Sequence, residues 1–188
     1  MKTTIYMIRH SKSHFVFGQE RRRKLSLQGE ADSKRVTDLM RHKEIDAIIS
    51  SPYMRAIQTI EGIANDKNLE IKVYEDLKER QLKGDYKLPE KEIHHAIKKS
   101  YEDHDFYLSG GESLRDVQNR SLPIIKSILN NYEGKTIIIG THGNIMTIIM
   151  NYFNSKYGYD FWKSTTKPDI YKLTFSKNKL LEVQRIWK

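Results

Sequence analysis

Thr3-Thr-Ile-Tyr-Met-Ile-Arg-His-Ser11, near the amino terminus, is an apolar run that ends abruptly in a cation and an imidazole. The apolar residues Ile5 to Ile8 predict a strand that is buried on both faces of a parallel sheet. Arg9 and His10 then fall at the carboxyl end of the strand, where open α/β sheets bind their ligands. Arg9 offers forked donors to an anion, and His10 can act as nucleophile, base or metal ligand. The plain alternative is a strand end with two solvated polar residues.

The composition restricts the class of protein and its partners. With 188 residues, 38% of them hydrophobic, the chain can form a sizeable core, and we expect a single domain over residues 1–188. No apolar run approaches the roughly 18 residues of a membrane helix, and there is no cysteine, so we expect a cytoplasmic protein that binds no membrane. The net charge of +9 favours anionic partners. Because no nucleic-acid-binding motif is apparent, we expect a phosphorylated small molecule or a phosphoprotein rather than nucleic acid.

Two further stretches repeat the pattern of a buried strand followed by a functional side chain. Residues 46–50 predict a second strand, and Ser51-Pro52 predicts a helix with Ser51 as N-cap. Arg55 would then lie in the first helical turn, where free N–H groups already favour anions. Residues 135–140 predict a third strand that ends just before His142.

The remaining segments complete an α/β fold, which we expect to be a three-layer α/β/α sandwich around a mostly parallel sheet. Ser26 is a predicted N-cap of a helix that runs to about Arg41. The buried positions expected on that helix are Ala31, Val36, Leu39 and Met40. The other expected elements are an edge strand at 70–74, an excursion at about 83–110 with a helix near 91–101, a long helix over 110–132 that Pro123 kinks or divides, and a closing strand pair at 170–175 and 180–187.

Arg21, Arg22, Arg23 and Lys24 form the densest basic run, in the loop that follows His10. One interpretation is a solvated loop that keeps the surface polar. The other is steering of polyanionic substrates towards the mouth of the site by Arg21, Arg22 and Arg23, an effect that salt would screen.

Three histidines, His94, His95 and His104, raise the question of a metal site. Their spacing matches no ligand template well, so we interpret them as helix-surface residues and expect no metal and no cofactor.

Arg9, His10, Arg55 and His142 all follow or end predicted strands of one sheet. In a parallel sheet the carboxyl ends lie at one edge, so these side chains are expected to face a common crevice. Two guanidiniums and two imidazoles gathered there would repel one another unless a dianion bound between them. A phosphoryl group, with oxygens that accept forked donors, fits this requirement.

The chain at this point resembles the histidine phosphatase superfamily, also called the phosphoglycerate-mutase-like family. The matching stretches occur in the family's order and cover residues 3 to about 150. They are Ile8-Arg9-His10, Leu25-Ser26 with Gly29, Ser50-Ser51-Pro52 with Arg55-Ala56 and Gln58-Thr59, Leu77-Lys78-Glu79, Gly111-Glu112-Ser113 and Thr141-His142-Gly143.

The resemblance implies a phosphomonoester hydrolase that works through a phosphohistidine without a metal. His10 would be the nucleophile, with His142 and Glu79 as the other catalytic residues. Arg9, Arg55 and His142 would hold the phosphate oxygens. Glu79 would protonate the leaving oxygen and then activate water, although Glu75 and Asp76 are close in sequence.

Three residues depart from the family's usual pattern. Ser11 stands where glycine is usual, Lys12 where an acidic residue is common, and Val16 where a phosphate-binding asparagine is expected. These departures keep open a catalytically weak module that binds phosphorylated ligands. A phosphoglycerate mutase is the other alternative, but the mutases that the chain resembles carry a longer insertion after the Glu79 segment, so hydrolysis is favoured.

Overall fold

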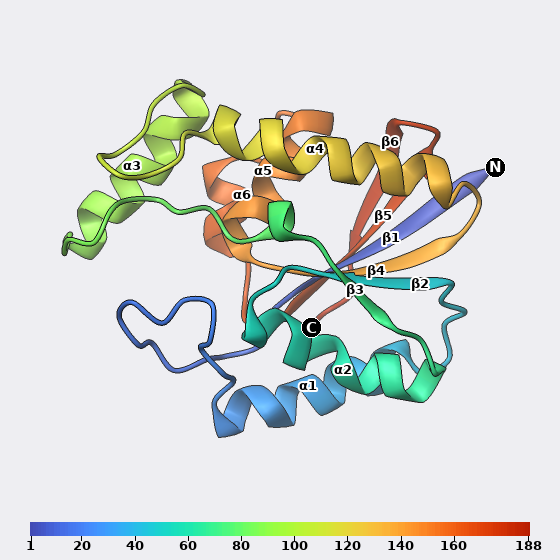
Figure 1. The fold of residues 1–188 in the computed structure, drawn as a ribbon. Helices are drawn as coiled ribbons and strands as arrows, with labels where there is room; N and C mark the ends of the chain where they lie inside the picture. The colour runs from blue at the N-terminus through green and yellow to red at the C-terminus, as the bar shows by residue number, and fades with distance from the viewer.

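The computed structural model describes residues 1–188 as a six-stranded sheet with helices on both faces (Figure 1). The strands are β1 Lys2–Arg9, β2 Ala47–Ser50, β3 Ile71–Val73, β4 Thr136–Thr141, β5 Asp169–Ser176 and β6 Lys179–Arg185. The helices are α1 Leu27–Met40, α2 Met54–Lys67, α3 Glu90–Glu102, α4 Leu114–Asn131, α5 Gly143–Phe153 and α6 Tyr159–Ser164, with a single 3₁₀ turn, η1, at Glu75–Leu77.

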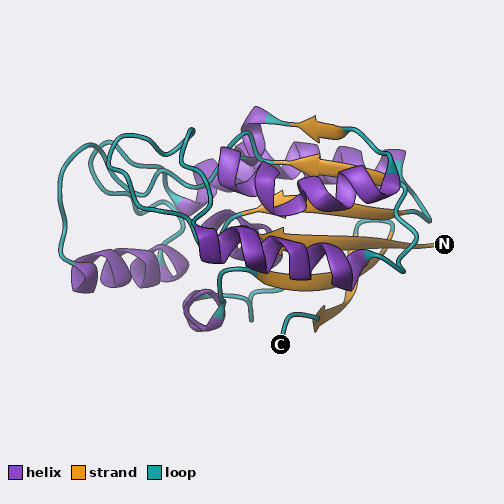
Figure 2. Ribbon diagram, turned by 90° about the horizontal axis from the view of Figure 1, so that it is seen from below, coloured by secondary structure: helices purple, strands orange, loops and turns teal.

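The strand order is β3-β2-β4-β1-β5-β6. Strands β3, β2, β4 and β1 are parallel to their neighbours, whereas β5 and β6 run antiparallel and close one edge. The predicted α/β class, the mostly parallel sheet and the closing strand pair are therefore confirmed. The parallel strands point towards the end of the molecule where α3 and the long loops gather (Figure 2).

Two layers of core explain why the apolar run of β1 is continuous. Ile5 and Met7 pack into the core that α4 and α5 cover, and Tyr6 and Ile8 pack into the core that α1 and α2 cover. All four side chains are at most 5% exposed. A strand covered on both faces has no reason to alternate apolar with polar residues. Complete burial of each such side chain contributes about 1.5–3 kcal/mol.

The buried face of α1 differs from the predicted one. Val36 and Met40 are buried as expected, but Ala31 is exposed and Leu39 is 43% exposed. Asp32 and Ser33 are buried instead. This helix packs partly against the loop that follows β1, so polar positions near its start are covered by backbone and hydroxyl groups rather than by the apolar core.

The close contact between α1 and that loop depends on Gly29. The Ser26 hydroxyl accepts a hydrogen bond from Gly29 N at 3.1 Å, which confirms Ser26 as the N-cap. A Cβ atom at Gly29 would lie 2.0 Å from the carbonyl oxygen of Lys12. Only glycine therefore lets the helix approach the loop that carries the residues after His10.

The start of α2 is a correction to the sequence analysis. The helix begins at Met54, and its N-cap is Tyr53, two residues after the expected cap Ser51. The Ser51 hydroxyl accepts from Tyr53 N at 3.2 Å and contacts His142, so it shapes a turn instead of capping the helix. Arg55 still falls in the first turn.

Helix α4 is continuous through Pro123, which neither ends nor divides it. Pro123 is exposed, so water can satisfy the carbonyl group that lacks its usual partner. The sequence analysis did not predict the short helix α6.

Candidate active site

Three strand ends bring the predicted site residues together. Arg9 pairs in register with Thr141 of β4, and Ser50 of β2 pairs with Gly140. His10 and His142 follow β1 and β4, and their ring centroids lie 5.2 Å apart. Arg55, from the first turn of α2, donates to His10. His10, Arg55 and His142 are each at most 4% exposed, so the group is enclosed by protein.

Hydrogen bonds determine the tautomer of His10. Its Nδ1 atom lies 2.7 Å from the carbonyl oxygen of Ser11, which can only accept, so Nδ1 carries the proton. Arg55 Nε donates to His10 Nε2 at 3.2 Å, so Nε2 must accept. The ring is therefore neutral, with the lone pair of Nε2 directed at a cationic group inside the site.

His142 is held from one side only. Its Nε2 lies 2.7 Å from the Ser51 hydroxyl, and the ring contacts the Tyr53 ring edge-on with centroids 5.1 Å apart. The Nδ1 atom is buried and has no hydrogen-bond partner. A buried ring nitrogen without a partner is the kind of polar atom that a bound ligand satisfies.

Burial and neighbouring positive charge act on both imidazoles. Burial, followed by the charge of Arg55, lowers the pKa of His10 well below its usual range. For His142, burial lowers the pKa most, and the charges of His10 and Arg55 lower it further. Both rings are therefore neutral at pH 7.

We expect the rings of His10 and His142 to stay neutral as the pH falls through about 6.5, the ordinary value for histidine. The pKa of each ring is lower in the folded protein than in the unfolded one. The contribution of each ring to stability is therefore fully present above about pH 6.5. Below it, stability falls by up to about 1.4 kcal/mol per pH unit for each ring. NMR titration of the imidazoles, with acid unfolding, measures both effects. Protonation of either ring near pH 6.5 in the folded protein would contradict the expectation.

Arg9 is anchored from the far end of the chain. Its guanidinium donates to the Thr165 hydroxyl and, at 3.2 Å, to the Thr165 carbonyl oxygen. Its Nε atom is buried without a partner. A Cβ atom at Gly143 would lie 2.8 Å from the central carbon of this guanidinium, so a side chain where α5 begins would displace Arg9.

Glu79 is held at the amino end of α5. Its carboxylate accepts hydrogen bonds from the backbone N–H groups of Asn144 at 3.1 Å and Ile145 at 2.9 Å, and also from Arg80. A helix amino terminus favours a carboxylate through its free N–H groups and dipole. Of the three neighbouring acidic residues, Glu79 alone is placed this way. Glu75 pairs with Arg21 at 2.5 Å, and Asp76 is exposed.

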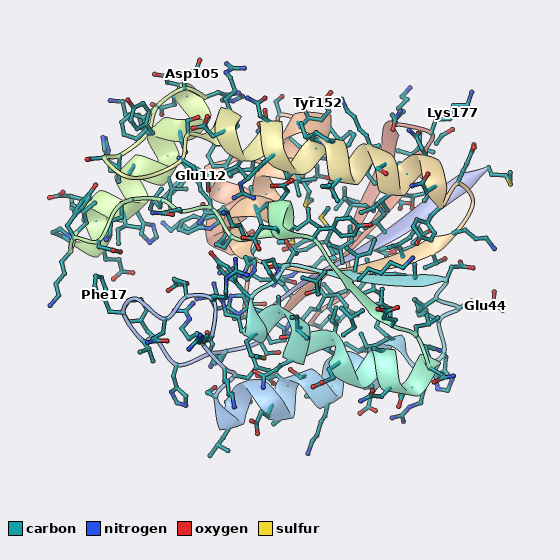
Figure 3. The ribbon with its side chains drawn as sticks, in the orientation of Figure 1. Phe17, Glu44, Asp105, Glu112, Tyr152 and Lys177 are labelled. Carbon is teal, nitrogen blue, oxygen red and sulfur yellow. The ribbon has the colours of Figure 1, made fainter.

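The segment that carries Glu79 is fastened by the start of α4. Arg120 donates to the carbonyl oxygens of Asp76 at 2.7 Å and Lys78 at 3.0 Å, and forms an ion pair with Glu112 at 2.7 Å. Glu112 also accepts from Gln81 N at 2.9 Å. Figure 3 shows Glu112 between the start of α4 and this segment. The Gly-Glu-Ser stretch therefore positions the backbone around Glu79.

The basic run separates into outward and inward residues. Arg21 is half-exposed and pairs with Glu75, and Arg22 and Lys24 are exposed. Arg23 turns inwards, with its side chain 12% exposed and its Nε atom buried without a partner. The run is therefore not a uniform solvated surface.

A cavity of about 570 Å³ opens beside Glu79. Its lining residues come from the loop after β1, the N-cap of α2, α3 and the segment after η1, and include Phe15, Phe17, Tyr53, Glu79, Lys83 and Ile93. Phe17 lies on the part of the loop that is far from the sheet (Figure 3). Tyr53, which lines this cavity, also contacts the His142 ring, so the cavity lies next to the imidazoles.

The departures from the family pattern lie away from the imidazoles or face other groups. The Ser11 hydroxyl is fully buried and accepts from the Ser33 hydroxyl at 3.1 Å, so it joins the loop to α1. Val16 is 47% exposed. The residues that sequence reasoning missed are Glu20, Thr165 and Lys167. The signal that could have located Thr165 and Lys167 is the closing strand pair. An antiparallel strand beside β1 begins at the edge where β1 ends, so the residues just before it lie near Arg9 and His10.

No group of three histidine, aspartate or glutamate side chains could hold a metal ion, and His94 Nδ1 instead pairs with the Tyr159 hydroxyl at 2.9 Å. No helix has the length and apolar character needed to cross a bilayer.

A sequence model of the histidine phosphatase superfamily (branch 1) matches residues 5–184, nearly the whole chain. The chain belongs to the histidine phosphatase superfamily. The match extends the resemblance seen in the separate motifs through the closing strands β5 and β6.

Relatives within the histidine phosphatase superfamily include phosphatases. Phosphoserine phosphatase 1 of Hydrogenobacter thermophilus is 27% identical over 127 residues, which span 63% of this chain and 58% of that protein. A phosphoserine phosphatase of Entamoeba histolytica, solved with 3-phosphoglyceric acid, is 19% identical with a TM-score of 0.79, covering 99% of this chain and 98% of that one. A mycobacterial glucosyl-3-phosphoglycerate phosphatase is 18% identical with a TM-score of 0.76, over 98% of this chain and 97% of that one. The two structural likenesses establish the fold.

Proposed function

We propose that this protein is a phosphatase that hydrolyses phosphomonoesters through a phosphohistidine at His10. The observation that carries the proposal is the state of the His10 ring. Its Nδ1 proton is held by the Ser11 carbonyl oxygen, so Nε2 keeps a lone pair inside an enclosed cationic site. An imidazole in this state is a nucleophile that does not first have to lose a proton.

In the first step, His10 Nε2 attacks phosphorus and the bond from phosphorus to the ester oxygen breaks. Glu79 protonates that oxygen, so the leaving group departs as an alcohol. Arg9, Arg55 and His142 bind the equatorial oxygens and stabilise the charge of the transition state. Buried donors without partners on Arg9 and His142 support this role.

In the second step, water attacks the phosphohistidine. Glu79, now a carboxylate, takes a proton from the water as the nitrogen–phosphorus bond breaks. Inorganic phosphate leaves, and His10 returns to its neutral form. The backbone N–H groups of α5 keep the carboxylate in one place through both steps.

The test is a screen of phosphorylated metabolites for phosphate release without added metal. The panel contains sugar phosphates, 3-phosphoglycerate, O-phosphoserine, nucleotides and a phosphopeptide. We expect release of inorganic phosphate from at least one class. Transfer from 2,3-bisphosphoglycerate to phosphoglycerate without net release would indicate a mutase instead. Binding without either reaction would leave only the phospho-ligand module.

We expect a chelator to leave the turnover rate essentially unchanged. Arg9 and Arg55 already supply the positive charge that a metal ion would bring to a phosphoryl group. The measurement is the initial rate after dialysis against a chelator, with and without added Mg²⁺ or Zn²⁺. Loss of turnover on dialysis, with recovery on addition of either ion, would contradict the proposed mechanism.

A further inference from the structure

One carboxylate of the protein itself lies between two arginines of the site. Glu20 Oε2 is 3.1 Å from the terminal nitrogen of Arg55, and Glu20 Oε1 is 3.3 Å from that of Arg23. The Glu20 backbone carbonyl also accepts from Arg55 at 2.6 Å. The two arginine side chains are 1% and 12% exposed, whereas that of Glu20 is 47% exposed. The two arginines are thus buried parts of the site, whereas the Glu20 carboxylate that bridges them lies on its exposed side.

Arg55 connects this carboxylate position to the reacting atoms. Its Nε atom contacts His10 Nε2 while its terminal nitrogens contact Glu20. The phosphate of a substrate must lie at His10, so the position now filled by the Glu20 carboxylate is next to the ester. An anionic group that binds there would belong to the same substrate molecule.

The charges of the site call for such a second anion. Burial lowers the pKa of Arg55 and His142 most, and the charge of Arg23 lowers both further. The charges of Arg9, Arg23 and Arg55 also act on Lys167. Although Lys167 is solvent-accessible as a residue, partial burial, followed by the charge of Arg9, lowers its pKa. The two negative charges of a phosphomonoester balance two of these four cations, because Glu79 is protonated and neutral when it acts as the acid. A carboxylate next to the phosphate, now that of Glu20, balances a third.

Resting on the proposed function, we infer that Arg23 is a specificity-determining residue that binds a carboxylate carried by the substrate close to its phosphate. Glu20 fills this position when no substrate is bound and gives it up when one binds. The substrate class is therefore a phosphorylated hydroxy acid or amino acid rather than a simple alkyl phosphate. Arg23 thus supplies a hydrogen-bond donor from the loop after β1, whereas the side chain of Val16 in the same loop supplies none.

The experiment compares kcat/KM for O-phosphoserine and O-phosphoethanolamine, which differ only in the carboxylate. We expect the wild type to prefer O-phosphoserine by roughly 10- to 100-fold, the range for a hydrogen bond to a charged group. Arg23→Gln should remove most of this preference, mainly through KM. Arg22→Gln, the matched control at the exposed neighbour, should keep it. Glu20→Gln should lower KM for O-phosphoserine, because the internal competitor loses its charge.

Salt separates direct binding from long-range steering. A preference that persists at 0.5 M salt supports a contact with Arg23, whereas one that vanishes there indicates steering by the whole basic run and overturns the inference. Equal rates on the two substrates in the wild type, or equal losses on both in Arg23→Gln, would also overturn it. If the wild type hydrolyses neither of these two substrates but releases phosphate from another member of the panel, the inference fails and the proposed function stands. If it releases phosphate from no member of the panel, the proposed function fails. Ligand-induced shifts in melting temperature then test the same carboxylate preference in the same variants.

Discussion

His10→Ala is expected to be inactive and to form no phosphoenzyme. The variant loses Nε2, the proposed attacking atom, and removal of a catalytic nucleophile lowers turnover by roughly 10⁴-fold or more. The measurement uses substrate with a labelled phosphate and a rapid quench. Protein quenched in base should retain the label and protein quenched in acid should lose it, because a phosphohistidine is stable only in base.

The matched control is His95→Ala, which removes an exposed histidine of α3. It should keep both the label and the turnover of the wild type. His10 is buried, so its variant must also be shown to be folded by circular dichroism and thermal unfolding. Base-stable label in folded His10→Ala would assign the nucleophile to another residue, and His142 is the nearest alternative.

Glu79→Gln is expected to separate substrates by their leaving groups. An alkyl phosphate such as O-phosphoserine needs a proton on its leaving oxygen, and loss of a general acid costs about 10²- to 10⁴-fold in rate. An aryl phosphate releases a stable phenolate and should lose far less in the step that forms the phosphohistidine. Rapid-quench measurement of the burst on p-nitrophenyl phosphate isolates that step from the hydrolysis that follows.

The controls for Glu79 are its acidic neighbours. Glu75→Gln and Asp76→Asn change carboxylates that lie at the surface and should leave the dependence on the leaving group intact. Glu79→Gln keeps one oxygen that can accept from the amino end of α5, so we expect a loss in stability of about 1 kcal/mol, comparable to the loss of a helix cap. Equal losses on alkyl and aryl phosphates in the burst phase would remove Glu79 from the acid role.

The conformation of Arg55 has a consequence for the order of events. Without substrate, its Nε atom contacts the lone pair of His10 and its terminal nitrogens contact Glu20. Phosphorus must approach the same lone pair, so the bound phosphate must replace the contact between Arg55 Nε and His10. A dianion interacts more strongly with a buried guanidinium than a neutral imidazole nitrogen does, which favours the exchange.

The sequence by itself determined the elements and the edge of the sheet at which the site lies. The apolar run Ile5–Ile8 is interrupted at Arg9, and the strands before Ser51 and His142 end in the same way, so local patterns locate the strand ends. Parallel pairing then requires those ends to meet. Caps and turns are likewise encoded within a few residues, as Ser26 with Gly29 shows.

Only the tertiary structure decided which side chains enter the site. Glu79 and Glu75 lie only four positions apart, and the preference for Glu79 rested on the family resemblance alone. In the structure Glu79 meets the amino end of α5, whereas Glu75 meets Arg21. Arg22 and Arg23 are adjacent, yet only the second turns inwards. The partners of Glu79 and Glu75 lie tens of residues away along the chain. Arg9 and Thr165 are separated by 156 positions. Side-chain direction in a loop depends on such distant contacts, and no local periodicity encodes them.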